Sequence, residues 1–167
     1  MSAPPLVPAD FSVPSSLVTE EFRLRMLTIN DVVKDYDAVM SSVDHLQGVF
    51  GPKSTWPAVD LSLEQDLIDL GWHQKEFQNR SSFAYTVMSL GESRCLGCVY
   101  IYPAEPADYD VQVILWARQS EIASGLEDRL LSAVKEWMRD SWPFERVGFP
   151  GKEIPWAEWM TMTVQSF

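Results

Sequence analysis

The sequence is poor in cysteine, in histidine and in basic residues. Its 167 residues include two cysteines, two histidines and 13 lysines and arginines, against 24 aspartates and glutamates, so the formal net charge is −11 at pH 7. This charge repels nucleic-acid phosphates and anionic membranes and favours cationic or neutral partners. No His, Asp and Glu spacing suggests a metal site, and no G-x-S-x-G motif suggests a hydrolase. We therefore expect no bound metal and no nucleic-acid partner.

Long apolar runs are also missing. No segment approaches the ~20 apolar residues that a membrane span needs. Residues 1–21 contain four prolines, without a basic region or a continuous apolar stretch, so no secretory signal is readable. We expect a soluble cytoplasmic protein whose residues 1–21 form an extended, proline-containing arm. The 46% apolar content fits a single globular domain over residues 22–167.

The two cysteines, Cys95 and Cys98, form a C-x-x-C within CLGCVYIY, a segment that is typical of a strand. Residues three apart on a regular strand point to opposite faces. A redox pair with this spacing needs a helix N-terminus, and a metal site needs two further ligands. We expect two structural thiols.

Hydrophobic periodicity predicts five strands and three helices in the order β, α, α, β, β, β, α, β. The expected strands are residues 22–28, a hairpin of 82–90 and 95–103, a doubly buried strand at 110–118, and a short strand at 146–150. The expected helices are residues 31–42 with Asn30 as the cap, residues 63–77, and residues 126–140. This order indicates an α/β (α+β) fold with a mixed, mostly antiparallel sheet flanked by helices.

Two of the helices have apolar stripes that predict their buried faces. The stripe of the last helix consists of Leu126, Leu130, Val134, Trp137 and Met138. In the second helix, Leu63, Leu67, Leu70 and Phe77 share one side, and Gly71 is a candidate break or kink.

The order of elements, with a loop ahead of the last helix, resembles the GNAT superfamily of acetyltransferases from Phe22 to Pro150. In that family acetyl-CoA enters a gap between the fourth and fifth strands, and a Q/R-x-x-G-x-G/A turn binds its pyrophosphate. The resemblance places this turn on Ile122, Ala123, Ser124, Gly125, Leu126 and Glu127. Only Gly125 matches the motif. Ile122 offers no side-chain donor, and Glu127 brings a carboxylate that would repel a polyanion at close range.

The residues of this turn also fit a second interpretation. Ser124-Gly125-Leu126-Glu127 is the S-x-x-E of a capping box, in which Ser124 accepts from the N–H of Glu127 and Glu127 from that of Ser124. A helix capped in this way has fewer free amides for a phosphate. We therefore favour a helix start over an anion site, with Arg118 and Arg129 as the cations available to a phosphate.

The resemblance further implies that the strand at Leu115, Trp116 and Ala117 pairs through its backbone with the pantetheine arm of acetyl-CoA. Backbone pairing tolerates most side chains, so this part of the site would survive a degenerate loop. A core position for Trp116 is the alternative.

Acetylation of an amine needs a base for the amine proton and an acid for the leaving thiolate. Asp110 and Glu105 are the candidate bases, with solvated loop carboxylates as the alternative. His73 is a candidate base or acceptor ligand in the region that covers the acceptor side in the family, with a structural histidine as the alternative. In the family a tyrosine after the fifth strand protonates the leaving thiolate, but no tyrosine follows Tyr109 in this sequence. The candidate acid is therefore a tyrosine of the hairpin. Tyr102 is the first choice, and Tyr85 and Tyr100 are the alternatives.

Two hypotheses about function follow. The first is an N-acetyltransferase that uses acetyl-CoA as co-substrate and acts on an amine of a small molecule or of a basic peptide. The second is a catalytically degenerate GNAT-fold protein that serves as a binding or assembly module. We favour the enzyme because binding of the co-substrate through backbone groups does not require the side chains of the motif.

The tail after Pro150 is shorter than the family's C-terminal part and rich in large apolar groups, among them Trp156, Trp159 and Phe167. A free segment of this composition would aggregate. We expect it to be ordered, as a final strand, as an edge cover, or in the interface of a homodimer.

Overall fold

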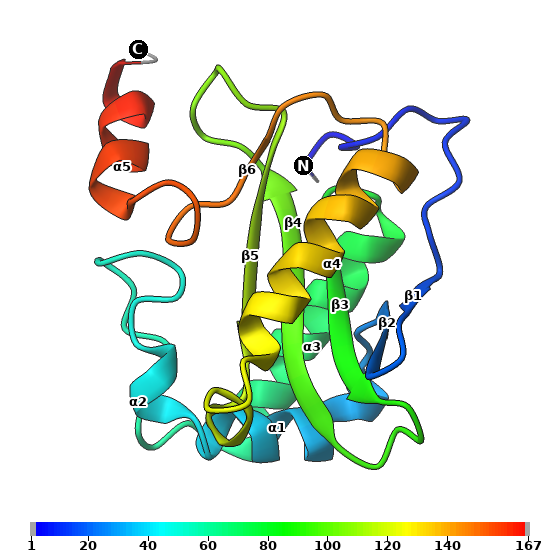
Figure 1. Cartoon of the computed structure of the whole chain (residues 1–167), viewed down its shortest axis with the longest axis vertical. Helices are drawn as coiled ribbons and strands as arrows, with labels where there is room; N and C mark the ends of the chain where they lie inside the picture. Colours follow the sequence, from blue (N-terminus) through cyan, green and yellow to red (C-terminus); the bar gives the residue numbers. More distant parts are fainter. Residues whose placement is uncertain (1–2, 166–167) are drawn as a thin grey trace.

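The computed structural model describes residues 3–165 and builds them around one six-stranded sheet (Figure 1). The strands, in their order across the sheet, are β1 (Ser16–Val18), β2 (Phe22–Met26), β3 (Phe83–Ser89), β4 (Cys95–Pro103), β5 (Val111–Ala117) and β6 (Val147–Gly148). Neighbours pair antiparallel except β5 and β6, which are parallel. The predicted mixed, mostly antiparallel sheet is confirmed.

Helices flank the sheet on both faces. They are α1 (Val32–Met40), α2 (Val43–Leu46), α3 (Leu63–Gln78), α4 (Leu126–Ser141) and α5 (Trp156–Gln165). In Figure 1 α4 crosses the front of the sheet, and α1 and α3 lie behind it. No helix within residues 3–165 combines the length and apolar character that crossing a membrane requires.

The face under α4 is a continuous apolar core. All five predicted stripe residues of α4 are buried, from Leu126 to Met138. They pack with alternate strand residues such as Val99, Val113 and Leu115. Burial of one such side chain stabilises the fold by about 1.5–3 kcal/mol, so this stripe is the main attachment of α4.

The buried face of α3 differs from the prediction. Leu63 and Leu67 are 46% and 40% exposed, whereas Asp66 and Leu70 are buried. The helix also runs without interruption through Gly71. The side of α3 that faces the sheet carries Asp66, Leu70 and His73, which line a cavity between this helix and β4.

The start of α1 was also predicted wrongly. Asn30 lies within a 3₁₀ turn, Ile29–Asp31, and the N-cap of α1 is Asp31. The Asp31 carboxylate accepts from the backbone N–H of Thr28 at 2.9 Å and from Arg25 at 2.8 and 3.0 Å. An ion pair with β2 therefore fixes the entry to α1.

Part of the segment before Phe22 joins the sheet. Strand β1 pairs with β2, Val7 is buried in the core under α4, and the Tyr85 hydroxyl donates to the carbonyl of Pro14 at 2.6 Å.

The expectation that Cys95 and Cys98 point to opposite faces is wrong. The register between β3 and β4 shifts, since Val87 pairs with Gly97 and Met88 with Cys95, which leaves Leu96 as the extra residue of a β-bulge. Both thiols therefore point to the side of α1 and α3. A Cβ at Gly97 would lie 2.0 Å from the carbonyl oxygen of Trp116, so this close approach of β4 to β5 requires glycine.

The tail is ordered as a helix through residue 165, and not as a strand. Trp159 of α5 is 2% exposed and packs on Tyr109, with ring centroids 4.9 Å apart. The expectation about Phe167 lies outside the described residues.

Candidate functional site

Two cavities lie against the central strands. The first, with a volume of about 310 Å³, opens between β4, α1, α3 and the loop before α3, and we call it the aromatic cavity. Its lining consists of Leu27, Asp35, Phe50, Trp56, Asp66, Asp69, Leu70, Trp72, His73, Tyr100 and Tyr102. The second, of about 170 Å³, lies beside β5 and we call it the strand-gap cavity. Its lining consists of residues 45–49, Ile114, Leu115, Trp116, Glu127, Pro150, Gly151, Lys152 and Trp156.

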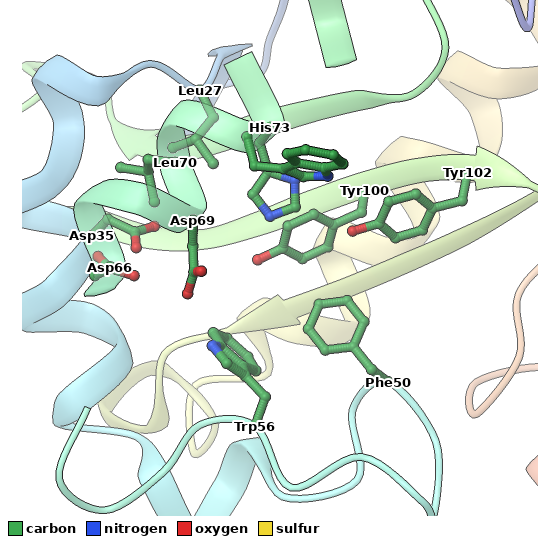
Figure 2. Close-up of a pocket in the computed structure, with 11 residues that line it drawn as sticks. Leu27, Asp35, Phe50, Trp56, Asp66, Asp69, Leu70, His73, Tyr100 and Tyr102 are labelled. Atoms are coloured by element: carbon green, nitrogen blue, oxygen red, sulfur yellow. The ribbon is translucent and has the colours of Figure 1, made fainter. Parts of the chain in front are cut away.

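Aromatic rings form most of the wall of the first cavity. Figure 2 shows Phe50 and Trp56 on one side and His73, Tyr100 and Tyr102 on the other. The Phe50 centroid is 5.1 Å from that of Tyr100 and 5.2 Å from that of Trp56. Ring faces attract cations within about 6 Å of their centroids. The cavity is therefore suited to an organic cation.

One end of the aromatic cavity holds two buried carboxyl groups, Asp35 of α1 and Asp66 of α3 (Figure 2). The two groups hydrogen-bond to each other, and burial raises the pKa of each above the usual range. The Oδ2 atom of Asp66 has no hydrogen-bond partner among the residues that the structure describes. Because buried polar atoms are almost always paired, this atom indicates a missing donor on the cavity side.

His73 of α3 stands beside Tyr100, with ring centroids 5.3 Å apart. Burial lowers the pKa of His73 below 6.5, although Asp69 and Glu76 oppose this shift. The imidazole is therefore neutral near pH 7 and able to accept a proton.

Two tyrosines of β4 line the same cavity as proton donors. Burial raises the pKa of both Tyr100 and Tyr102 above the usual range, so both keep their hydroxyl protons. The Tyr100 oxygen accepts from Nε1 of Trp116 at 3.1 Å, which connects the aromatic cavity to β5.

The strand-gap cavity exists because β5 and β6 separate. Within the described chain they pair only at Val111–Val147 and Gln112–Gly148. Beyond these pairs the backbone of β5 from residue 113 onward faces the gap. Leu115 and Trp116, predicted from the resemblance as backbone ligands, both line this cavity.

The capping box predicted for Ser124 and Glu127 does not form. The N-cap of α4 is Gly125, with φ +79°, and the Ser124 hydroxyl donates to the carbonyl of Glu121 at 2.8 Å. Glu127 turns instead into the strand-gap cavity. Its carboxylate accepts from the backbone N–H of Ala117 at 3.0 Å and lies 2.9 Å from Nε2 of His45.

Lys152 also donates to the Glu127 carboxylate. Burial opposes ionisation of Glu127, but Ala117, Lys152 and His45 together hold the pKa of Glu127 below its usual range. The strand-gap cavity therefore contains an ionised carboxylate between two basic side chains.

The cations expected to serve a phosphate are engaged elsewhere. Arg118 is buried and donates to the carbonyl of Cys95 and to Asp37 and Ser41. Arg129 donates to Glu21 and to the carbonyl of Ser124. The basic side chains that line the strand-gap cavity are His45 and Lys152, and neither was singled out from the sequence as a ligand.

The remaining candidate residues lie outside both cavities. The Asp110 carboxylate accepts from the backbone N–H groups of Glu145 and Arg146 at 3.0 and 2.9 Å, which lowers its pKa and fixes the start of β6. Glu105 is exposed in a loop. Ile122, Ala123 and Ser124 form an exposed turn, and Leu126 is in the core.

Several residues of the aromatic cavity were not candidates in the sequence analysis: Leu27, Asp35, Phe50, Trp56, Asp66, Asp69 and Trp72. A carboxylate on a predicted helix is ordinarily a solvated group. The single available signal was the spacing of Asp66, Leu70 and His73, which fits a helix face as well as the leucine stripe does.

Neither a protein-family model nor a curated protein matches the chain. Solved structures with the same fold do match. They include RimL, a ribosomal L7/L12 alpha-N-protein acetyltransferase in complex with coenzyme A, at 17% identity and a TM-score of 0.60, with 75% of this chain and 69% of that chain covered.

A ribosomal-protein-S5-alanine acetyltransferase from Vibrio fischeri matches at 18% identity and a TM-score of 0.57, over 75% of this chain and 67% of that chain. MccE, a microcin C7 self-immunity acetyltransferase in complex with acetyl-CoA and AMP, matches at 14% identity and a TM-score of 0.62, over 82% of this chain and 73% of that chain. The chain therefore has the fold of the GNAT acetyltransferases, as the order of its elements predicted.

Proposed function

We propose that this chain is an acetyl-CoA-dependent N-acetyltransferase that acts on an amine of a small molecule or of a basic peptide. The proposal rests on one observation: Trp116 lies between the two cavities and contacts residues of both. This residue lines the strand-gap cavity, and its indole contacts Tyr100 and Trp56 of the aromatic cavity, with the two tryptophan centroids 6.3 Å apart. An acyl donor on one side and an amine on the other would meet there.

The aromatic cavity has the chemistry of an ammonium site. Ring faces of Phe50, Trp56 and Tyr100 surround it, and the unpartnered Oδ2 of Asp66 supplies an acceptor at its inner end. The net charge of −11 raises the local concentration of a cationic acceptor. RimL, to which the chain is similar, is named for acetylation of a protein α-amine, which fits an acceptor of this type.

The strand-gap cavity fits part of acetyl-CoA. The free edge of β5 offers backbone groups to an amide-containing arm, and His45 and Lys152 offer positive charge to phosphates. Its volume of about 170 Å³ is below the ~300 Å³ of a typical pocket for a drug-sized ligand, so the nucleotide end would lie outside it. Acetyl-CoA, when bound, supplies the acetyl thioester that the amine attacks.

In this proposal, residues of the aromatic cavity accept and donate the protons of the reaction. His73, neutral at pH 7, accepts a proton from the ammonium group, so that the nitrogen lone pair becomes available. Tyr102 and Tyr100 hold protons that a departing thiolate can take up. The Tyr100 hydroxyl is connected to β5 by its hydrogen bond with Trp116.

Glu127 sets the condition for binding of acetyl-CoA. The first hydrogen bond of the α4 ladder runs from Arg129 to Gly125, so the amides of the first turn lack intrahelical partners, as at any helix N-terminus. The Glu127 carboxylate contacts both His45 and Lys152, and a diphosphate would have to displace it from both side chains. This same contact favours the second candidate function, a binding module without catalysis.

Calorimetric titration with acetyl-CoA, followed by an acetyl-transfer assay, tests the proposal. The acceptors are a polyamine, a basic peptide with a free N-terminus and the same peptide with a blocked N-terminus and no lysine. We expect binding of acetyl-CoA and release of coenzyme A only with acceptors that carry a free amine. Absence of both binding and transfer, in the wild type and after Glu127→Gln, would leave the binding-module function.

A further inference from the structure

Behind the aromatic cavity, two thiols and a carboxylate converge in a way that acetyl transfer does not explain. An oxygen of Asp35 and the sulfurs of Cys95 and Cys98 all lie within 4.8 Å of one another, and all three residues are buried. The β-bulge at Leu96 produces this convergence, because without it the two thiols would point to opposite faces.

The spacing of these atoms fits a tetrahedral metal site. Zn²⁺ binds thiolate sulfur at about 2.3 Å and carboxylate oxygen at about 2.0 Å, so two such ligands lie about 3.5 Å apart at the tetrahedral angle. The Sγ of Cys98 is 3.5 Å from Oδ1 of Asp35. This edge of the coordination tetrahedron is therefore already formed, and no backbone movement is required to make it.

One buried positive group lies against this cluster. The Asp35 carboxyl has a weak thiol donor on one side and the Asp66 carboxyl on the other. The guanidinium of the buried Arg118 donates to the carbonyl oxygen of Cys95 at 3.0 Å. Two thiolates, one carboxylate and a divalent cation carry a net charge of −1, and Arg118, which also pairs with Asp37 at 3.1 Å, is the positive group beside them.

We propose that Asp35, Cys95 and Cys98 bind one thiophilic divalent cation, with Zn²⁺ as the physiological class. Binding replaces the two thiol protons, which pass to solvent, and the proton shared by the two carboxyl groups stays on Asp66. The fourth coordination position faces Asp66 and the aromatic cavity, where a water molecule completes the tetrahedron. The ion ties α1 to the bulge of β4, below the wall formed by Tyr100.

Cobalt is the probe that tests this site, because Co²⁺ takes tetrahedral zinc sites and reports its ligands in its absorption. Cys95 and Cys98 are the only two cysteines of the chain, so thiolate-to-cobalt charge transfer has no other source. The reduced protein is loaded without oxygen, both in its folded state and by refolding with Co²⁺, so that a closed entry path does not hide the site. We expect one Co²⁺ per chain, the visible bands of a tetrahedral ion, and displacement by Zn²⁺.

Variants separate this site from adventitious binding. Cys95→Ser with Cys98→Ser abolishes the charge-transfer band, and Asp35→Asn weakens Co²⁺ affinity by at least about tenfold. Ser93→Ala, in the exposed turn before β4, is the matched control and retains the bands. A folded wild type without these bands after both loading procedures would overturn the proposal. Bands that persist in the double serine variant would also overturn it. Neither readout depends on acetyl transfer, so the result is independent of the proposed function.

Discussion

The carboxylate of Glu127 accepts a hydrogen bond from the backbone N–H of Ala117 across 3.0 Å, and so connects the first turn of α4 to the last residue of β5. In the fold of GNAT acetyltransferases this is the region expected to receive a pyrophosphate. The same carboxylate contacts His45 and Lys152, so an anion bound there would compete with it for these two side chains.

Substitution of Glu127→Gln should strengthen binding of acetyl-CoA. The amide oxygen still accepts from Ala117, but the negative charge that competes for His45 and Lys152 is gone. We expect the Kd of acetyl-CoA to fall by about tenfold or more, which corresponds to about 1.4 kcal/mol. Calorimetry measures this change. Glu121→Gln, whose carboxylate pairs with Arg94 outside the strand-gap cavity, is the control and should leave the Kd unchanged. Equal affinities of wild type and Glu127→Gln would show that Glu127 does not compete with the phosphates.

The pH dependence of acetyl transfer should report His73. Burial lowers the pKa of His73 below 6.5, and a base must be unprotonated to act. After correction for the titration of the amine substrate, kcat/KM should therefore stay level from pH 8 to about pH 6.5 and fall only as pH decreases through the lowered pKa.

His73→Gln should remove this limb of the pH profile and lower kcat by about 100-fold or more. His45→Gln is the matched histidine control, and it should change the affinity for acetyl-CoA while the limb remains. A limb that persists unchanged in His73→Gln would assign the base to another group.

Recognition of the ammonium group should depend on Asp66. Within residues 3–165 its Oδ2 has no hydrogen-bond partner, so Asp66→Asn replaces an acceptor by a neutral amide. We expect KM for a cationic amine to rise by about tenfold, with a smaller change in kcat, because a charged hydrogen bond contributes about 1.5–3 kcal/mol. Steady-state kinetics with Glu64→Gln, an exposed carboxylate on the same helix, provides the comparison. An equal rise of KM in Asp66→Asn and Glu64→Gln would show that Asp66 contributes only to the net charge and does not contact the amine.

Docking of α5 should depend on the contact between Trp159 and Gly148. A Cβ at Gly148 would lie 2.5 Å from the Trp159 ring, so Gly148→Ala should lower the free energy of unfolding by about 1–3 kcal/mol through overpacking. Trp159→Ala should lower it by about 3–5 kcal/mol through a cavity. Urea denaturation measures both, with Val59→Ala, at an 80% exposed position, expected to stay within about 0.5 kcal/mol of wild type.

Because Trp156 of the same helix lines the strand-gap cavity, both core variants should also weaken binding of acetyl-CoA. If Gly148→Ala has the same free energy of unfolding as the wild type, α5 does not depend on this contact with the sheet.

The fold was predictable where one face of an element is apolar. The stripe from Leu126 to Met138 identified both the existence of α4 and its buried face, and alternation identified β2. Two β-rich runs separated by a turn identified the hairpin. Burial of apolar area dominates at these positions, and periodicity reports it directly.

The candidate site was less predictable because polar groups turn inward there. On α3 the leucine pattern pointed to Leu63 and Leu67, whereas Asp66 and His73 face the cavity. The convergence of Cys95 and Cys98 depends on a bulge in β4, which a strand pattern does not report, and Gly97 beside the bulge packs closely on Trp116. Ser124 and Glu127 fit a capping box in sequence, but Glu127 finds stronger partners in Ala117, His45 and Lys152, which are distant or outside the motif.

The most direct measurement of the central claim is mass spectrometry of a basic peptide with a free N-terminus after incubation with the protein and acetyl-CoA. We expect an acetylated peptide and free coenzyme A in equal amounts, faster formation with Glu127→Gln at limiting acetyl-CoA, and loss of at least about 99% of the rate with His73→Gln. Failure of the wild type and of Glu127→Gln to acetylate this peptide or a polyamine, under conditions where both are folded, would contradict it.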